Sequence, residues 1–175
     1  MNQSGRITFL DNLRAFVIVL VVILHGSMVY MVGAPEWWYV VDTQNSLFFT
    51  ILVLLIDVPI MLIMFFIAGY FAMPSLVKRG PEQFLKDKFI RVGAPWLVGV
   101  FFLAPLTAYM VYIRWGTPVT YLQFWITDFW TVAFQQSVYW YLGVLFSFFF
   151  LLVLAYDISG RLRSAEQRAS MPTWK

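Results

Sequence analysis

The 175-residue sequence contains no cysteine. Disulfide bonds, zinc–thiolate sites, iron–sulfur clusters and a cysteine nucleophile are therefore excluded. It contains one histidine, His25, so a single chain cannot supply two axial histidines to a haem. We expect no metal site and no bound cofactor.

Charged residues are also scarce. They make up 12% of the chain, whereas soluble domains carry about 25%. Hydrophobic residues make up 61%, more apolar surface than a soluble fold of this size can hide. We therefore expect the chain to lie in a lipid bilayer, and we expect no nucleic-acid partner.

Four apolar stretches each reach the roughly 20 residues that a membrane-spanning helix needs. In lipid such segments must be helical, because every backbone polar group needs an internal partner. The sequence therefore predicts an all-α, polytopic membrane helix bundle. The predicted spans are residues 13–33, 47–73, 93–113 and 139–156. Residues 1–157 form one transmembrane domain in this prediction, and residues 158–175 form a basic tail.

Several residues mark the expected ends of these helices. Asp11 is a candidate N-cap of the first helix, and Asn45 or Ser46 of the second. Pro74 is expected to stop the second helix. Pro105 lies inside the third helix and predicts a kink there.

The basic residues fall on one side of the predicted bundle. Eleven of the twelve lie before or at the start of the first helix, after the second or after the fourth, and only Arg114 lies in the other loops. The positive-inside rule makes that side cytoplasmic, so both chain ends are predicted to lie in the cytoplasm. Aromatic clusters near the other side predict an interfacial belt. Its members are Trp37, Trp38, Tyr39, Trp115, Trp125 and Trp130.

Two further stretches resemble amphipathic helices that lie in the membrane surface. They cover residues 81–92 and 121–136. The second could be a polar fifth span, although Asp128 and its glutamines favour the interfacial interpretation. A passable signal-peptide cleavage site follows the first span, but that span is too long for a typical signal peptide, and we favour a retained helix.

Arg14 and His25 are the central candidates for chemistry. They are eleven residues apart, so on a helix they share a face to within about 20° and are separated by about 16 Å along the axis. Arg14 would lie at the cytoplasmic mouth and His25 near the midplane. A histidine at that depth is a functional candidate by default. The alternative is a histidine hydrogen-bonded between helices and an arginine that reaches the headgroups.

Two acidic residues could orient these groups. Asp57 also lies near the midplane and could contact His25 and raise its basicity. The alternative, which we favour, is that Asp57 faces a wet crevice beside Pro59. Asp11 could pair with Arg14 at three-residue spacing, or simply cap the helix.

Lys88 and Arg91 share one face of the basic helix 81–92. Such a pair can bind phosphates. The alternative is a basic loop that touches anionic lipids.

Four motifs follow one another along the chain. The first is residues 9–14, followed by His25 eleven residues after Arg14. The second is residues 64–71, the third is residues 84–95, and the fourth is residues 139–142. In this order they resemble the motifs of the acyltransferase 3 family of membrane O-acyltransferases, which has the same spacing from the basic residue to the histidine. In that family a serine stands in place of Ala68 and an arginine in place of Lys88.

The resemblance covers about residues 7–155 and is closest to the branch that succinylates osmoregulated glucans. It implies a bacterial inner-membrane protein that transfers an acyl group from acyl-CoA, a co-substrate on the cytoplasmic side, to a carbohydrate hydroxyl. It implies that His25 is the general base, that Arg14 stabilises anionic groups, and that Lys88 and Arg91 bind the donor phosphates.

Family members are longer and have more spanning helices. A fragment, a split gene or a shortened relative would explain the difference, and a second polypeptide or further copies of this chain could complete the bundle. A non-catalytic four-helix membrane protein is the second candidate function. A transporter that uses His25 and Asp57 is the third.

Overall fold

A computed structural model describes residues 8–116 and 119–170 of the chain, with side chains over residues 9–116 and 119–160. The described residues are helical apart from loops and one isolated bridge between Met31 and Ser46. Four helical stretches are long and apolar enough to cross a membrane, which confirms the predicted all-α fold. They are Phe9–Met28, Leu47–Arg79, Pro81–Arg114 and Ser137–Gly160.

The first helix, α1, spans Thr8–Met28. Asp11 lies within its first turn, so the prediction that Asp11 is the N-cap is wrong. The helix also ends five residues before the predicted residue 33. A loop follows, and two backbone hydrogen bonds of 2.9 Å close it: the N–H of Asp42 donates to Val29 and the N–H of Ser46 to Tyr30.

The second helix, α2, spans Leu47–Arg79. Ser46 is its N-cap, as predicted, and its hydroxyl accepts a hydrogen bond of 3.3 Å from the N–H of Phe48. The prediction that Pro74 stops this helix is wrong, because the helix continues five residues further. A helix in lipid tolerates proline where other groups satisfy the freed carbonyl. The chain turns instead at Gly80, whose positive φ of 79° favours glycine.

The third stretch is one continuous helix rather than a separate surface helix and a span. It consists of α3 (Pro81–Lys88), the π-helical turn η1 (Phe89–Gly93), α4 (Ala94–Val98), the π-helical turn η2 (Gly99–Leu103) and α5 (Ala104–Arg114). Each π turn ends two residues before a proline. A wider turn relieves the clash between a proline ring and the preceding turn. The irregularity predicted at Pro105 therefore takes the form of a π turn.

The predicted helix 121–136 is shorter in the structure. It consists of α6 (Tyr121–Gln123), the π-helical turn η3 (Phe124–Asp128) and α7 (Phe129–Thr131). One of its faces packs against α5, and its position in the membrane surface stays a prediction. Phe124 and Phe129 are fully buried with Ala104 and Ala108 of α5, whereas Thr127 is exposed.

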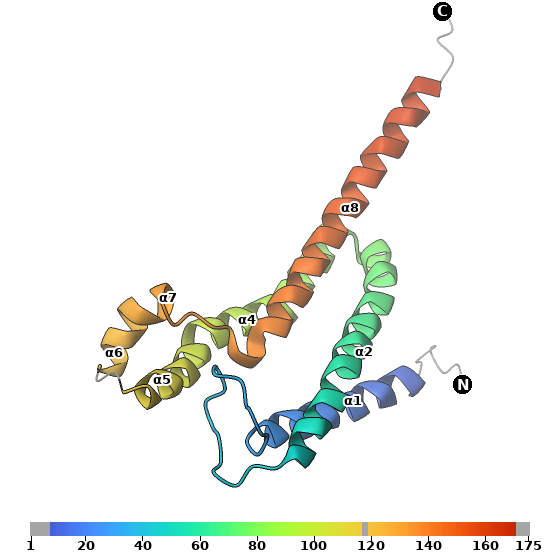
Figure 1. The fold of residues 1–175 in the computed structure, drawn as a ribbon. Coiled ribbons are helices and arrows are strands. Elements are labelled where there is room, and N and C mark those ends of the chain that lie inside the picture. The colour runs from blue at the N-terminus through green and yellow to red at the C-terminus, as the bar shows by residue number, and fades with distance from the viewer. Residues whose placement is uncertain (1–7, 117–118, 171–175) are drawn as a thin grey trace, which may run out of the picture.

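The last stretch begins with a 3-10 turn, η4 (Ser137–Tyr139), and continues as α8 (Trp140–Ser170). In Figure 1 the far end of α8 extends well beyond the other helices. The helix does not break at residue 156, so the predicted tail begins as a continuation of the span.

Among the described residues, buried apolar side chains form three small clusters. One joins α1, α2 and the loop between them, one joins α2, α3 and α8, and one joins α5 to residues 124–129. Many other apolar side chains of α2 are exposed, including Leu54, Leu55 and Leu62. Such faces fit lipid or further helices rather than water.

Candidate functional site

A cavity of about 480 Å³ lies where α1, α2 and α3 meet, and we call it the basic cavity. α1 contributes one residue, the end of α2 contributes five, and the helix from α3 into η1 contributes four. The lining residues are Arg14, Phe71, Pro74, Ser75, Lys78, Arg79, Phe84, Asp87, Lys88 and Arg91. Five cations and one carboxylate therefore surround it, which favours an anionic ligand.

The one carboxylate that lines the basic cavity is already engaged. Asp87 forms an ion pair with Arg79 and accepts a hydrogen bond of 2.8 Å from the amide of Gln83. Asp87 can therefore offset only part of the positive charge. The remaining cations keep the cavity attractive to phosphate or carboxylate groups.

Aromatic rings hold two of the cations in place. The guanidinium carbon of Arg14 lies 4.8 Å from the centre of the Phe71 ring. The ammonium of Lys88 lies 4.3 Å from the Phe149 ring and 5.3 Å from the Phe84 ring. Cation–π contacts of this kind orient a charged side chain without neutralising it.

The structure brings together Arg14, Lys88 and Arg91, three residues that the sequence singled out on two separate helices. Lys78 and Arg79 also line the cavity, although their sequence pattern indicates only that they are positive charges on the cytoplasmic side. Lys78 and Arg79 lie directly before the turn at Gly80, which brings them opposite α3. This arrangement is visible only once α2 and α3 have folded against each other.

His25 lies further along α1 and does not line the basic cavity. Its Nδ1 lies 2.8 Å from the carbonyl oxygen of Val21. A carbonyl only accepts, so Nδ1 carries the proton in this hydrogen bond and the lone pair of the neutral ring is on Nε2. The indole ring of Trp38 lies 5.8 Å from the imidazole ring, centre to centre.

The two candidate orienting carboxylates lie on different helices, Asp11 on α1 and Asp57 on α2. Asp57 is exposed, and among the described side chains no hydrogen bond or ion pair links it to the imidazole. Asp11 lies one turn before Arg14 in α1. An orienting role for either carboxylate stays a prediction.

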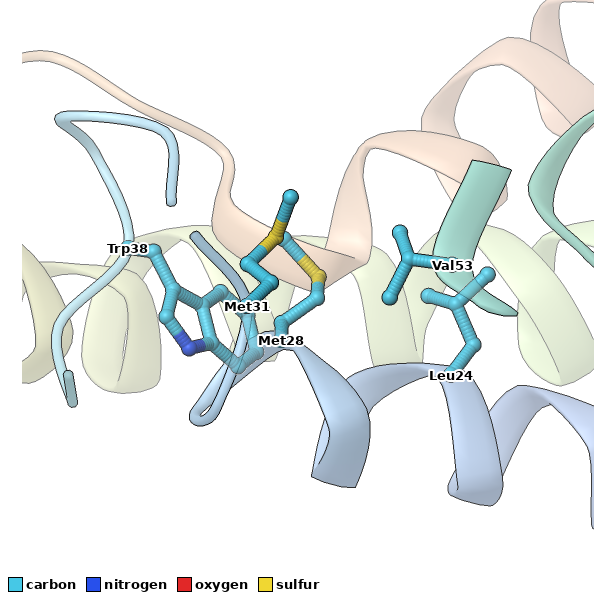
Figure 2. Close-up of a cluster of buried hydrophobic side chains, with 5 residues drawn as sticks. All are labelled: Leu24, Met28, Met31, Trp38 and Val53. Carbon is cyan, nitrogen blue, oxygen red and sulfur yellow. The ribbon is translucent and has the colours of Figure 1, made fainter. Parts of the chain in front are cut away.

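Trp38 differs from its predicted position. Sequence analysis assigned it to an interfacial aromatic belt, but its side chain is only 2% exposed, whereas that of the adjacent Trp37 is 45% exposed. Figure 2 shows Trp38 beside Met31 and Met28 in the cluster that joins the loop to α1 and α2. The sequence could not separate the two tryptophans, because only the path of the loop decides which one points inward.

A second cavity, of about 410 Å³, lies between this loop and α5. Aromatic and aliphatic side chains make up most of its lining, with Glu36 and Gln135 as polar members. The rings belong to Trp37, Tyr112, Trp115 and Phe134. It is therefore chemically unlike the basic cavity.

Comparison with known proteins settles the family. Residues 7–168 match the acyltransferase domain of the acyltransferase 3 family. The chain belongs to this family. With its four apolar helices, it is an acyltransferase 3 family membrane protein.

The chain is also distantly similar to curated relatives named glucans biosynthesis protein C. It is 30% identical to the proteins of Shigella boydii and Shigella dysenteriae and 29% identical to that of Escherichia coli K12, in each case over 92 residues. These residues cover 53% of this chain and 23% of each relative. No solved structure matches the chain significantly.

Proposed function

We propose that this chain is the donor-binding part of a membrane O-acyltransferase, with the basic cavity holding the phosphates of acyl-CoA and His25 acting as general base. The observation that carries the proposal is the basic cavity itself, in a chain of the acyltransferase 3 family. The acceptor is a hydroxyl of a cell-envelope carbohydrate, in keeping with the names of the relatives.

The spacing along α1 fits an elongated donor. Arg14 lies at the basic cavity, and His25 lies eleven residues further on the same helix, about 16 Å along its axis. A ligand with phosphates at one end and a reactive thioester at the other spans such a distance. Coenzyme A has this form, because a flexible pantetheine arm separates its phosphates from its sulfur.

The proposed reaction uses few groups. Nε2 of His25 accepts the proton of the acceptor hydroxyl as its oxygen attacks the thioester carbonyl. The carbon–sulfur bond then breaks, the acyl group remains on the acceptor oxygen, and the thiolate of coenzyme A takes up the proton. The cations of the basic cavity hold the donor and do not take part in these bond changes.

Radiolabelled acyl transfer tests this proposal. Membranes that contain the protein in its natural assembly are supplied with labelled acyl-CoA and envelope glycans. His25→Ala is expected to lower the transfer rate by about 10²- to 10⁴-fold, the usual contribution of a general base. The control, Val22→Ala, alters an exposed apolar residue of the same helix and is expected to leave the rate unchanged. Unchanged transfer in His25→Ala would show that the assignment is wrong.

A further inference from the structure

Trp38 is a buried aromatic residue in an otherwise irregular loop. Its backbone N–H donates a hydrogen bond of 2.9 Å to the carbonyl of Pro35. The hydroxyl of Thr50 on α2 binds the loop at Val32, through both the N–H and the carbonyl of that residue. The loop is thus bound at several points, and its fixed path holds the indole inside.

The Trp38 ring contacts the only histidine of the chain. Its plane is tilted by 35° from that of His25, with 5.8 Å between the ring centres. The centre of the Trp38 ring also lies 4.8 Å from that of Tyr39 and 5.7 Å from that of Trp37. The imidazole therefore has two restraints: the hydrogen bond from Nδ1 to Val21 and the indole ring.

The indole N–H of Trp38 is buried and has no hydrogen-bond partner among the described residues. Tryptophan N–H groups inside proteins usually find an acceptor, because an unsatisfied buried donor is costly. Figure 2 shows the nitrogen on the side of the indole that faces away from Met31. An unsatisfied buried donor in a native structure calls for an explanation, and a role in a functional site is one of the few that apply.

We infer that Trp38 both positions His25 and binds substrate: its ring holds the imidazole in the orientation in which Nδ1 donates to Val21, and its N–H donates to an oxygen atom of the bound substrate. This inference rests on the proposed role of His25 as base. The substrate atom that the Trp38 N–H would bind beside His25 is a hydrogen-bond acceptor, either a hydroxyl oxygen or a carbonyl oxygen. Trp37, which is exposed and contacts Trp38 only edge-on, has no such role.

The first test uses the fact that His25 is the only histidine. In the full chain with ¹⁵N-labelled histidine, NMR gives one pair of ring-nitrogen resonances, which report the tautomer directly. The wild type and Trp37→Ala are expected to show mainly the Nδ1–H form. Trp38→Ala is expected to shift the population toward the Nε2–H form that free imidazole side chains prefer. Carbethoxylation of His25 should also accelerate several-fold.

The tautomer measurement does not depend on catalysis. If Trp38→Ala leaves both the tautomer and the carbethoxylation rate at the wild-type values, the positioning role is refuted. Circular dichroism and the melting temperature of the same samples show whether the variant remains folded. Should Trp38→Ala unfold, Trp38→Leu provides the same comparison with more of the apolar volume retained.

The second test isolates the N–H. Trp38→Phe keeps an aromatic ring but removes the donor, so the tautomer should stay as in the wild type. In the acyl-transfer assay kcat is expected to fall about tenfold, the effect of one lost hydrogen bond in the transition state, with KM for acyl-CoA unchanged. An unchanged kcat would refute the donor role. If His25→Ala itself transfers normally, the proposed function fails, and the NMR result still decides whether Trp38 positions the ring.

Discussion

Asp87 limits the positive charge of the basic cavity more than any other side chain that lines it. It is the one carboxylate among the lining residues, and it holds Arg79 in an ion pair. Both partners are partly solvent-exposed, so the pair itself adds little stability. Its main effect is to lower the positive electrostatic potential that the cavity presents to an anionic ligand.

Asp87→Asn is therefore expected to strengthen the binding of coenzyme A by a few-fold. The substitution keeps the shape of the side chain, removes its negative charge and releases Arg79 to the ligand. Titration at low salt measures the effect, and at about 1 M salt it should largely disappear, because the screening length falls to about 3 Å. Weaker binding at low salt would mean instead that the ion pair is needed to place Arg79.

Single residues also show what the sequence could and could not predict. The placement of Arg14 and His25 on one face of α1 followed from helix geometry alone, because a helix repeats regularly. The burial of Trp38 did not follow, since interfacial and buried tryptophans have the same local composition. The prediction that Asp11 is an N-cap was wrong for a similar reason. An aspartate is favoured both at the N-cap and in the first turn of a helix, so the sequence does not distinguish the two positions.

Among the elements, the contact of the third helical stretch with η4 and α8 depends on two glycines, which have no side chain at the point of closest approach. A Cβ atom added to Gly143 would lie 2.6 Å from the indole nitrogen of Trp96, and one added to Gly99 would lie 2.6 Å from the Tyr139 ring. Small residues let helices approach closely, which is a main source of helix association in membranes. Trp96 also donates a hydrogen bond of 3.0 Å to Gln136.

Gly143→Ala is expected to lower the free energy of unfolding by about 1 to 3 kcal/mol, because overpacking forces the Trp96 ring to move. Gly69→Ala is the matched control: Gly69 lies inside α2 and has no atom within 4 Å of the added Cβ. There alanine should stabilise the helix by up to about 1 kcal/mol. Unfolding of the detergent-solubilised protein by SDS measures both. Equal stability of the two variants would contradict the close approach.

Helix ends and proline effects were the least predictable features of the elements. A proline inside a helix is expected to end or kink it, and this applies equally to Pro74 and Pro105. Yet α2 continues through Pro74, and a π turn precedes Pro105. Neighbouring helices decide how the lost hydrogen bond is accommodated, and a single sequence does not contain them. The four apolar spans were predictable because their length is fixed by the thickness of the bilayer.

At the scale of the whole molecule, the five cations of the basic cavity lie together where α1, α2 and α3 meet, and the proposed function requires that end of the bundle to face the cytoplasm. The natural absence of cysteine makes single-cysteine variants direct reporters of orientation. Gln44 and Glu82 are exposed and lie in the loop before α2 and in α3.

Gln44→Cys is expected to react with a membrane-impermeant maleimide in intact spheroplasts. Glu82→Cys should react only after the membrane is permeabilised, because the positive-inside rule places α3 in the cytoplasm. Gel-shift labelling measures both variants. The reverse pattern would place the basic cavity on the wrong side for a cytoplasmic acyl donor.

The proposed function depends on the binding of the acyl-CoA phosphates in the basic cavity. Calorimetric titration of coenzyme A into the reconstituted protein tests it most directly, with Lys88→Gln compared with Lys86→Gln. Both lysines belong to α3, but only Lys88 lines the cavity, and Lys86 is exposed. Loss of one charge-assisted hydrogen bond predicts about tenfold or greater weakening in Lys88→Gln and wild-type affinity in Lys86→Gln. Equal affinities in the two variants, or no binding by the wild type, would contradict the claim.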